Sequence, residues 1–269
     1  AVTCDIMRNY DKVQPFIKAA ENNDVCLIGD FKTQVIHNKI VFKVLHDDMT
    51  SAFLTDEEKT LVQRLFSCRD IPCEVMGTGV EVPCTPDEKA FRQKFGINGD
   101  YVIYVGRIDE GKNCPEMFRY FMEYKSRHPE SGLKLVLMGK PVCKVPKHSD
   151  IISLGFVSEE DKFSGISGAK VLVLPSEFES LSISVLEAMT LSVPVIVNGR
   201  CEVLKGHCVK SNCGLYYTNY FEFEGILDYI FSHDGEYEIL RENAREYVDK
   251  NYRWDVIIKK FKEVIDCYD

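Results

Sequence analysis

The chain of 269 residues lacks several features that would assign a protein to a class at once. No apolar run approaches the roughly 18 residues that a membrane span needs. The first residues, AVTCDIMRNYDK, lack the basic-then-apolar order of a signal peptide. Positive charge is in the minority, because 33 lysines and arginines face 42 aspartates and glutamates, a net charge of −9. We therefore expect a cytoplasmic protein without a transmembrane segment and without a nucleic-acid partner, although peripheral membrane contact stays compatible with the sequence.

Common signatures of nucleotide and metal sites are missing as well. Neither the Walker pattern G-x4-G-K-[ST] nor the dinucleotide fingerprint G-x-G-x-x-G occurs. The 11 cysteines lie mostly in apolar runs and form no paired C-x2-C spacing. This favours reduced, buried thiols over a disulfide framework. The one local cluster joins Cys201, His207, Cys208 and Cys213. We interpret it as core and loop residues, with a structural metal as the less favoured alternative.

What is present is a regular alternation of strand and helix patterns from Tyr101 onward. Short runs rich in Val, Ile and Leu are typical of strands buried on both faces of a parallel sheet. They occupy residues 101–107, 133–139, 151–156, 169–176, 193–198 and 214–219. Amphipathic stretches between them predict helices over residues 114–128, 158–168, 182–191 and 201–208. This order predicts an α/β, doubly wound, Rossmann-like domain.

Local signals refine this prediction at both ends of the domain. Thr85 to Glu88 and Ser158 to Asp161 both have the character of a helix-starting capping box. The last fifty residues predict helices over 223–232, 238–251 and 255–268. Trp254 is the single tryptophan, and we expect it to anchor the terminal helix by packing.

The N-terminal part predicts only about half of a second doubly wound sheet. Helical patterns cover residues 11–23 and 55–66, and strand patterns cover 24–30, 39–48 and 71–77. Two glycines and two prolines make residues 77–89 the natural hinge. We predict a partial N-terminal, acceptor-side domain over residues 1–80, a nucleotide-sugar-binding domain over 81–252, and a terminal helix over 253–269 that packs back toward the first domain.

Two strand-to-helix turns carry the residues that point to chemistry. Ligands bind beyond the carboxyl ends of the strands in sheets of this class. After the fourth strand, the amides of Ser180, Leu181, Ser182 and Ile183 would lie at a helix N-terminus, which favours a phosphate. Glu179 and Glu187 flank this turn, and sugar hydroxyls would be suitable donors to both. The competing interpretation is that Glu187 closes a capping box with Ser184 and that Glu179 is a solvated loop carboxylate.

The second turn follows the first strand of the domain. Gly106 and Arg107 end that strand, and Gly111 and Lys112 precede the next helix. Glycine lets the backbone approach a phosphate, arginine binds two oxygens, and lysine supplies a point charge. The turn therefore predicts a cradle for a diphosphate, although R-x4-K by itself also occurs by chance on surface helices.

These segments, in this order, resemble the retaining glycosyltransferases of family 4. The resemblance rests on VGRIDEGKN, VLMG and LGFVSEEDKFSGISGAKVLVLPSEFESLSISVLEAMTLSVPVIV, and it covers about residues 70–269. Its central signature is a pair of glutamates with seven residues between them, matched by Glu179 and Glu187. The resemblance implies a GT-B fold, in which two Rossmann-like domains face each other across a cleft.

The resemblance also implies roles for individual residues. Arg107 and Lys112 would neutralise the donor diphosphate, and Glu187 would hold the ribose hydroxyls. The transferred sugar would contact Glu179, and the amides of Ser180, Leu181, Ser182 and Ile183 would bind sugar and distal phosphate. The nucleobase would meet Phe156 and Val157, and Gly139 would line the same cleft. His46 would lie near the donor sugar, where it would form the candidate catalytic pair with Glu179.

The chain departs from the family pattern at two places. Where the family commonly has E-G-F-G, this chain has Glu179-Ser180-Leu181-Ser182, which adds side chains beside the sugar. The first half of the N-terminal sheet is absent, so the resemblance implies an incomplete N-terminal domain. Either that domain is short in this protein or the sequence omits segments of it.

We therefore expect a retaining transferase that moves a sugar from a UDP-, GDP- or ADP-sugar to a glycan, lipid-linked or small-molecule hydroxyl. No D-x-D motif is present, so we expect no metal and no further cofactor. Two alternatives stay open. One is an epimerase or phosphorylase of the same architecture, and the other is a non-catalytic donor-binding remnant or subunit.

Overall fold

The computed structural model describes residues 77–266, with side chains up to residue 263. The chain divides into two compact units, Ala1–Val75 and Met76–Asp269, and every described residue belongs to the second. The elements predicted for residues 1–76, and with them the N-terminal domain, lie outside the described residues. The predicted three-part division of the chain stays a prediction.

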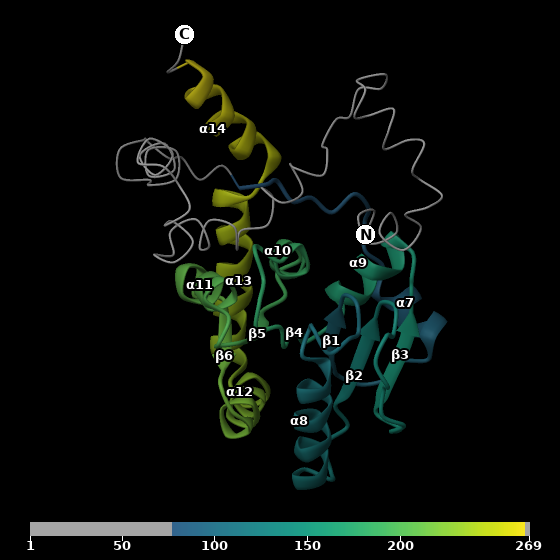
Figure 1. Cartoon of the computed structure of the whole chain (residues 1–269). Coiled ribbons are helices and arrows are strands. Elements are labelled where there is room, and N and C mark those ends of the chain that lie inside the picture. Colours follow the sequence, from purple (N-terminus) through teal and green to yellow (C-terminus); the bar gives the residue numbers. More distant parts are fainter. Residues whose placement is uncertain (1–76, 267–269) are drawn as a thin grey trace, which may run out of the picture. The chain divides into compact units, whose positions relative to one another are not determined.

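A six-stranded parallel sheet forms the centre of the second unit (Figure 1). Its strands are β1 (Tyr101–Val105), β2 (Lys134–Met138), β3 (Ile151–Gly155), β4 (Val171–Leu174), β5 (Val195–Asn198) and β6 (Gly214–Tyr217). The spatial order is β3-β2-β1-β4-β5-β6, the doubly wound order. The four central strands are buried almost throughout, and the edge strands β3 and β6 are more exposed. The continuous apolar runs therefore predicted all six strands, and the α/β fold class is confirmed.

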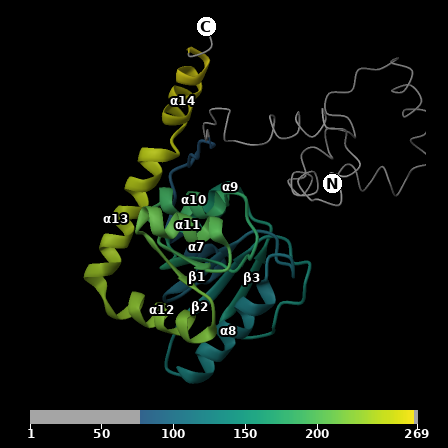
Figure 2. The same ribbon diagram turned by 60° about the vertical axis from the view of Figure 1, so that its left-hand side comes forward.

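Helices cover both faces of this sheet. They are α7 (Glu88–Phe95), α8 (Cys114–Arg127), α9 (Glu159–Ser167), α10 (Ile183–Thr190), α11 (Glu202–Ser211), α12 (Tyr220–Ser232), α13 (Asp234–Asn251) and α14 (Trp254–Asp266). In Figure 2, α9, α10 and α11 lie above the sheet, and α8 and α12 lie below it. α13 packs along α10 and α11. None of these described helices is both long enough and apolar enough to cross a membrane.

The chain reverses its winding direction between β1 and β4. These two strands are neighbours in the sheet, yet β1 leads through α8 to one side and β4 leads through α10 to the other. The loops that leave their carboxyl ends therefore diverge, and in sheets of this order the crevice between such loops is where ligands bind. Both turns that the sequence singled out begin at these two strand ends.

Helix α7 begins later than the capping box at Thr85 predicted. Its N-cap is Asp87, whose carboxylate accepts a hydrogen bond from the Ala90 amide at 2.9 Å. The Asp87 amide in turn donates to the Ser164 hydroxyl of α9 at 2.9 Å. This tertiary bond helps to fix the start of the helix after Asp87. The prediction for Ser158 is confirmed, since its hydroxyl accepts from the Asp161 amide at 3.1 Å.

Trp254 stands at the start of α14 and packs on the chain near Gly79. A Cβ atom added to Gly79 would lie 2.2 Å from the indole ring, so the ring rests directly on this glycine. Next to it, the Val80 amide donates to the Tyr252 carbonyl at 2.7 Å. Trp254 therefore anchors the start of α14 by packing on the segment around Gly79, as predicted.

Candidate functional site

Asp109 organises the turn that follows β1. Its carboxylate forms an ion pair with the Arg107 guanidinium and accepts a hydrogen bond from the Lys112 amide at 2.7 Å. The Tyr104 hydroxyl donates to the Arg107 carbonyl at 2.7 Å. Burial raises the pKa of Tyr104, so this donor stays protonated. The turn is thus held in one shape by a buried carboxylate that the sequence reasoning did not single out, although an aspartate three residues before the bonded amide is a common turn signal.

Lys112 and Glu179 lie together although 67 residues separate them in the sequence. The Lys112 ammonium is 2.6 Å from a Glu179 carboxylate oxygen, and Glu179 is largely buried. Lys112 belongs to the turn after β1 and Glu179 to the turn after β4. The structure therefore joins the two predicted turns by a direct ion pair across the crevice.

Glu187 pairs with Lys162 of α9. The distance between the ammonium nitrogen and the carboxylate oxygen is 2.8 Å, and both side chains are mostly shielded from solvent. The N-cap of α10 is Ser182, so Ser184 lies inside the helix and cannot start a capping box with Glu187. The capping interpretation of Glu187 is therefore wrong. Lys162 was missed, because a lysine inside an amphipathic helix is usually a solvated surface residue.

The turn after β4 ends in an unusual residue. Ser182 has φ +67°, in the left-handed region that glycine prefers, and its side chain caps no amide. It occupies the position at which E-G-F-G has its second glycine. No acidic residue stands in the first turn of α10, and within residues 77–266 no hydrogen bond is recorded to the amides of Ser180, Leu181, Ser182 and Ile183. The helix N-terminus is therefore free to receive an anion.

Gly139 brings the ends of β1 and β2 together. A Cβ atom at Gly139 would lie 1.9 Å from the Gly106 carbonyl oxygen, so only glycine fits there. The φ of +137° at Gly139 is also a backbone conformation that favours glycine. Its amide donates to the Gly155 carbonyl at 2.7 Å, at the end of β3. Beyond β3, the side chain of Phe156 is 91% exposed and Val157 is half-buried. These residues line the same edge of the sheet as the two turns.

A second charged group lies beside the turns and was not expected. Arg200, after β5, contacts Glu177 at 2.9 Å and Glu116 of α8 at 3.8 Å. The Asn113 side chain donates to Glu116 at 3.0 Å. These contacts tie the start of α8 to the end of β5. Nothing in the spacing of the sequence predicted them, since Glu116, Glu177 and Arg200 come from three separate segments of the chain.

His46 lies outside the described residues. Among residues 77–263, no group of three His, Cys, Asp or Glu side chains is placed to hold a metal ion. The six cysteines of this part are free thiols, and Cys114, Cys201, Cys208 and Cys213 are buried, as the sequence predicted for them.

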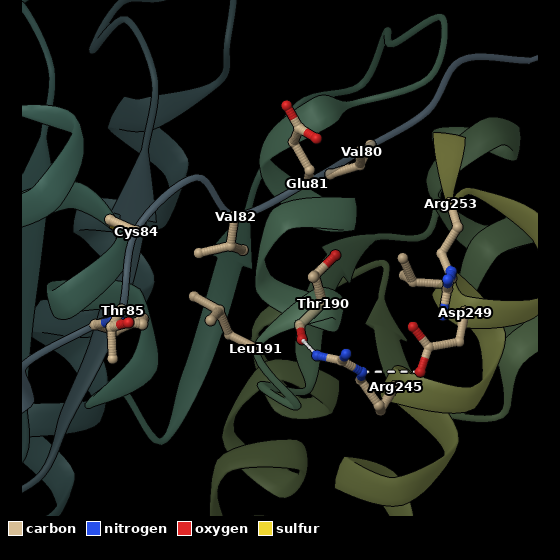
Figure 3. A pocket seen from close by; sticks show the side chains of 12 residues that line it. Val80, Glu81, Val82, Cys84, Thr85, Thr190, Leu191, Arg245, Asp249 and Arg253 are labelled. Atoms are coloured by element: carbon tan, nitrogen blue, oxygen red, sulfur yellow. Dashed lines mark hydrogen bonds and ion pairs between the residues drawn. The ribbon is translucent and has the colours of Figure 1, made fainter. Parts of the chain in front are cut away.

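One described pocket lies away from the two turns, at the far end of α10 (Figure 3). It has a volume of about 420 Å³ and is lined by residues 80–82 and 84–86, by Thr190 and Leu191, by three residues of α13 and by Arg253. Arg245 spans its floor, donating to the Thr190 carbonyl at 2.6 Å and pairing with Asp249 at 2.9 Å. The second arginine of the pocket, Arg253, pairs with Asp255 at 3.0 Å, so both cations are engaged by protein groups, and none of the predicted site residues lines this pocket.

Comparison with known proteins identifies the family of the chain. Residues 87–251 match the family described as glycosyl transferases group 1. An uncharacterized glycosyltransferase of Methanocaldococcus jannaschii is 28% identical over 85% of this chain and 58% of its own length. The O-antigen chain mannosyltransferase B of Escherichia coli is 26% identical over 57% of this chain and 45% of its own length. The chain thus spans about half the length of these curated relatives.

Solved structures share the fold at low sequence identity. The Anabaena protein HepE in complex with UDP superimposes with a TM-score of 0.63 at 14% identity, over 78% of this chain and 62% of that one. A sucrose-phosphate synthase from Thermosynechococcus elongatus superimposes with a TM-score of 0.59 at 17% identity, over 80% of this chain and 57% of that one.

Proposed function

The chain belongs to the group 1 glycosyl transferases, and from this premise we propose that it transfers a sugar from a nucleoside diphosphate donor to an acceptor hydroxyl. The observation that carries the proposal is the ion pair between Lys112 and Glu179, at 2.6 Å. It joins a predicted diphosphate ligand to a predicted sugar ligand at the switch point of the sheet, where such folds bind ligands. HepE, a fold neighbour, has been crystallised with UDP and with UDP-glucose, which supports the donor class.

The diphosphate is bound by cations and by a helix end. Arg107 and Lys112 approach it from the turn after β1, and the free amides from Ser180 to Ile183 approach it from α10. In the unliganded protein the two cations are paired with Asp109 and Glu179. A diphosphate takes over these cations, and Glu179 is then released to accept hydrogen bonds from the sugar hydroxyls.

The nucleoside lies on the other side of the crevice. Glu187 accepts hydrogen bonds from the ribose hydroxyls, and its carboxylate is already held in place by Lys162. Phe156 and Val157 contact the nucleobase through backbone atoms, and the close approach at Gly139 shapes the wall between base and phosphate. A UDP-, GDP- or ADP-sugar satisfies this arrangement.

The reaction proceeds with retention and without a metal, as the resemblance to family 4 implies. Charge that develops on the leaving diphosphate is stabilised by Arg107, Lys112 and the N-terminus of α10. The transition state is oxocarbenium-like, with attack on the face from which the diphosphate leaves. His46 is the proposed partner of Glu179 near the sugar. The acceptor hydroxyl belongs to a glycan, a lipid-linked molecule or a small molecule, and the cytoplasm stays the predicted location.

The test replaces Arg107 and Lys112 by alanine in the full chain. Calorimetry with UDP, GDP and ADP should show binding of at least one of them to the unaltered protein. The binding free energy of that ligand should be about 3 kcal/mol less favourable in the double variant. Each charge-assisted contact is worth roughly 1.5–3 kcal/mol, and part of this is offset because both cations give up existing ion pairs when the ligand binds. Affinity for the nucleoside alone should change much less.

A control pair, Lys89→Ala with Lys259→Ala, removes the same net charge from exposed helical positions. The diphosphate affinity of this control should stay within about twofold of that of the unaltered protein, because exposed charges farther away than a Debye length, about 8 Å, are screened. Equal losses in both pairs, or no binding of any nucleoside diphosphate or its sugar by the unaltered chain, would refute the proposed site. Product analysis without acceptor tests the epimerase alternative, which requires a changed nucleotide sugar.

A further inference from the structure

His207 contacts the turn that follows β4. It belongs to α11, and its side chain is buried, with about 5% of the residue exposed. Its Nε2 atom is 2.9 Å from the Leu181 carbonyl oxygen, and its Nδ1 atom is 3.1 Å from the Tyr247 hydroxyl of α13. Both ring nitrogens are therefore occupied by hydrogen bonds, which explains this histidine without a metal.

The two contacts define the tautomer of the ring. A carbonyl oxygen can only accept, so Nε2 carries the proton and donates it to Leu181. Burial lowers the pKa of His207, so the ring is neutral near pH 7 and Nδ1 accepts from the Tyr247 hydroxyl. Burial also raises the pKa of Tyr247, which keeps that hydroxyl protonated. Tyr252 packs against the ring on another side, with ring centroids 5.9 Å apart.

The bond to Leu181 controls the direction of the next amide. In a trans peptide the carbonyl and the following N–H point in opposite directions, and the described chain has no cis peptide. Because the Leu181 carbonyl points to His207, the Ser182 N–H points away from α11. Ser182 also has φ +67°, a conformation that is strained for a non-glycine residue and persists only when its surroundings hold it.

We propose that His207 is a positioning residue, which fixes the turn from Glu179 to Ser182 so that the Ser182 amide faces the sugar-phosphate part of the donor. This inference rests on the proposed function for the identity of the ligand, and on the contacts of His207 for the position of the turn. The geometry of the donor site is thereby set from α11 and α13, two helices that carry none of the predicted donor-binding residues. A serine can replace the usual glycine at position 182 because the hydrogen bond from His207 holds the neighbouring Leu181 carbonyl in place.

The test compares two substitutions of His207 in the full chain. His207→Gln places an amide nitrogen near the position of Nε2 and keeps a donor to Leu181, whereas His207→Leu fills the space without one. Cys208→Ala is the matched control, since Cys208 is the next buried residue of α11 and its recorded hydrogen bond goes to Leu215, away from the turn. Tyr247→Phe keeps the aromatic ring beside His207 and removes the hydroxyl that bonds Nδ1, together with the contact of that hydroxyl with the Tyr252 hydroxyl at 3.4 Å.

Hydrogen exchange of the unliganded protein measures the turn without any ligand. The Leu186 amide, which donates to the Ser182 carbonyl at 3.4 Å and is the first bonded amide of α10, should exchange faster in His207→Leu than in the unaltered chain, by at least about tenfold for the loss of one buried hydrogen bond. The exchange should stay near normal in His207→Gln and Cys208→Ala and rise to an intermediate level in Tyr247→Phe. Nitrogen NMR of the His207 ring should show the proton on Nε2, a readout that needs no variant.

Binding connects the turn to the donor. With whichever of UDP-, GDP- or ADP-glucose the unaltered chain binds, His207→Leu should weaken affinity by roughly tenfold to a hundredfold, the equivalent of one charge-assisted hydrogen bond. The nucleoside alone should bind unchanged, and His207→Gln should restore most of the loss.

The inference is overturned by a proton on Nδ1, by unchanged exchange in His207→Leu, or by an equal rise in Cys208→Ala. It is also overturned if His207→Leu loosens the turn but binds the nucleotide sugar normally. If the unaltered chain binds no nucleotide sugar, the proposed function fails, and the exchange and NMR data still decide whether His207 positions the turn.

Discussion

At the scale of single residues, the ion pair between Glu187 and Lys162 determines what a substitution of either partner should do. Glutamine at position 187 keeps the size and can still accept a hydrogen bond from Lys162. Because ion pairs that retain solvent contact are worth about 1 kcal/mol or less, Glu187→Gln should change the melting temperature of the unliganded protein only slightly. It removes the charge and half of the acceptor capacity that a ribose diol needs.

We therefore expect Glu187→Gln to show a clearly smaller thermal shift with the nucleoside diphosphate, and to discriminate less between that ligand and its 2′- and 3′-deoxy forms. Lys162→Met is the matched control, since it removes the same ion pair and leaves the carboxylate. It should lose comparable stability and retain the discrimination. Normal nucleotide binding by Glu187→Gln would remove Glu187 from the donor site.

The sequence singled out candidate ligand-binding residues more readily than the residues that hold those candidates in place. Arg107, Lys112, Glu179 and Glu187 belong to motifs with fixed spacing, so they could be named, and the structure places each at the predicted edge. Asp109, Lys162, Arg200 and His207 were missed as partners. Three of them form contacts with residues far away in the sequence, and no spacing encodes such contacts.

At the scale of the elements, burial made the strands easier to predict than the helix starts. A parallel strand covered on both faces must be apolar throughout, so runs such as residues 171–174 admit few other interpretations. A capping signal is only two or three residues long and recurs by chance. At α7 the sequence predicted a start at Thr85, whereas the N-cap is Asp87, whose amide is bonded to the Ser164 hydroxyl of α9.

The position of this N-cap makes a prediction about stability. Asp87→Ala removes the N-cap acceptor for the Ala90 amide and should lower the free energy of unfolding by about 1 kcal/mol. Thr85→Ala should change it by no more than about 0.5 kcal/mol, since Thr85 lies outside the helix. Chemical denaturation of the full chain measures both. A larger loss for Thr85→Ala would instead support the capping box that the sequence suggested.

At the scale of the whole molecule, an acidic protein is proposed to bind an anionic ligand. With a net charge of −9, the chain as a whole repels a diphosphate, so attraction has to be local. In the described part, Arg107 and Lys112 stand at the crevice together with the open N-terminus of α10. In the proposed mechanism these groups take the place that a divalent cation has in enzymes with a D-x-D motif, which the sequence does not contain.

The last prediction follows from this local neutralisation. Sugar transfer, or donor hydrolysis where the acceptor is unidentified, should proceed at an unchanged rate in excess chelator, and added magnesium or manganese should not accelerate it. The rate is measured as release of nucleoside diphosphate by the full chain after dialysis against chelator. The Arg107→Ala, Lys112→Ala double variant sharpens the test. If protein cations carry the leaving-group charge, the variant should be slow with and without magnesium. Activity that disappears in chelator and returns with magnesium or manganese would show instead that a metal ion stabilises the diphosphate, and the assignment of this role to Arg107, Lys112 and α10 would have to be abandoned.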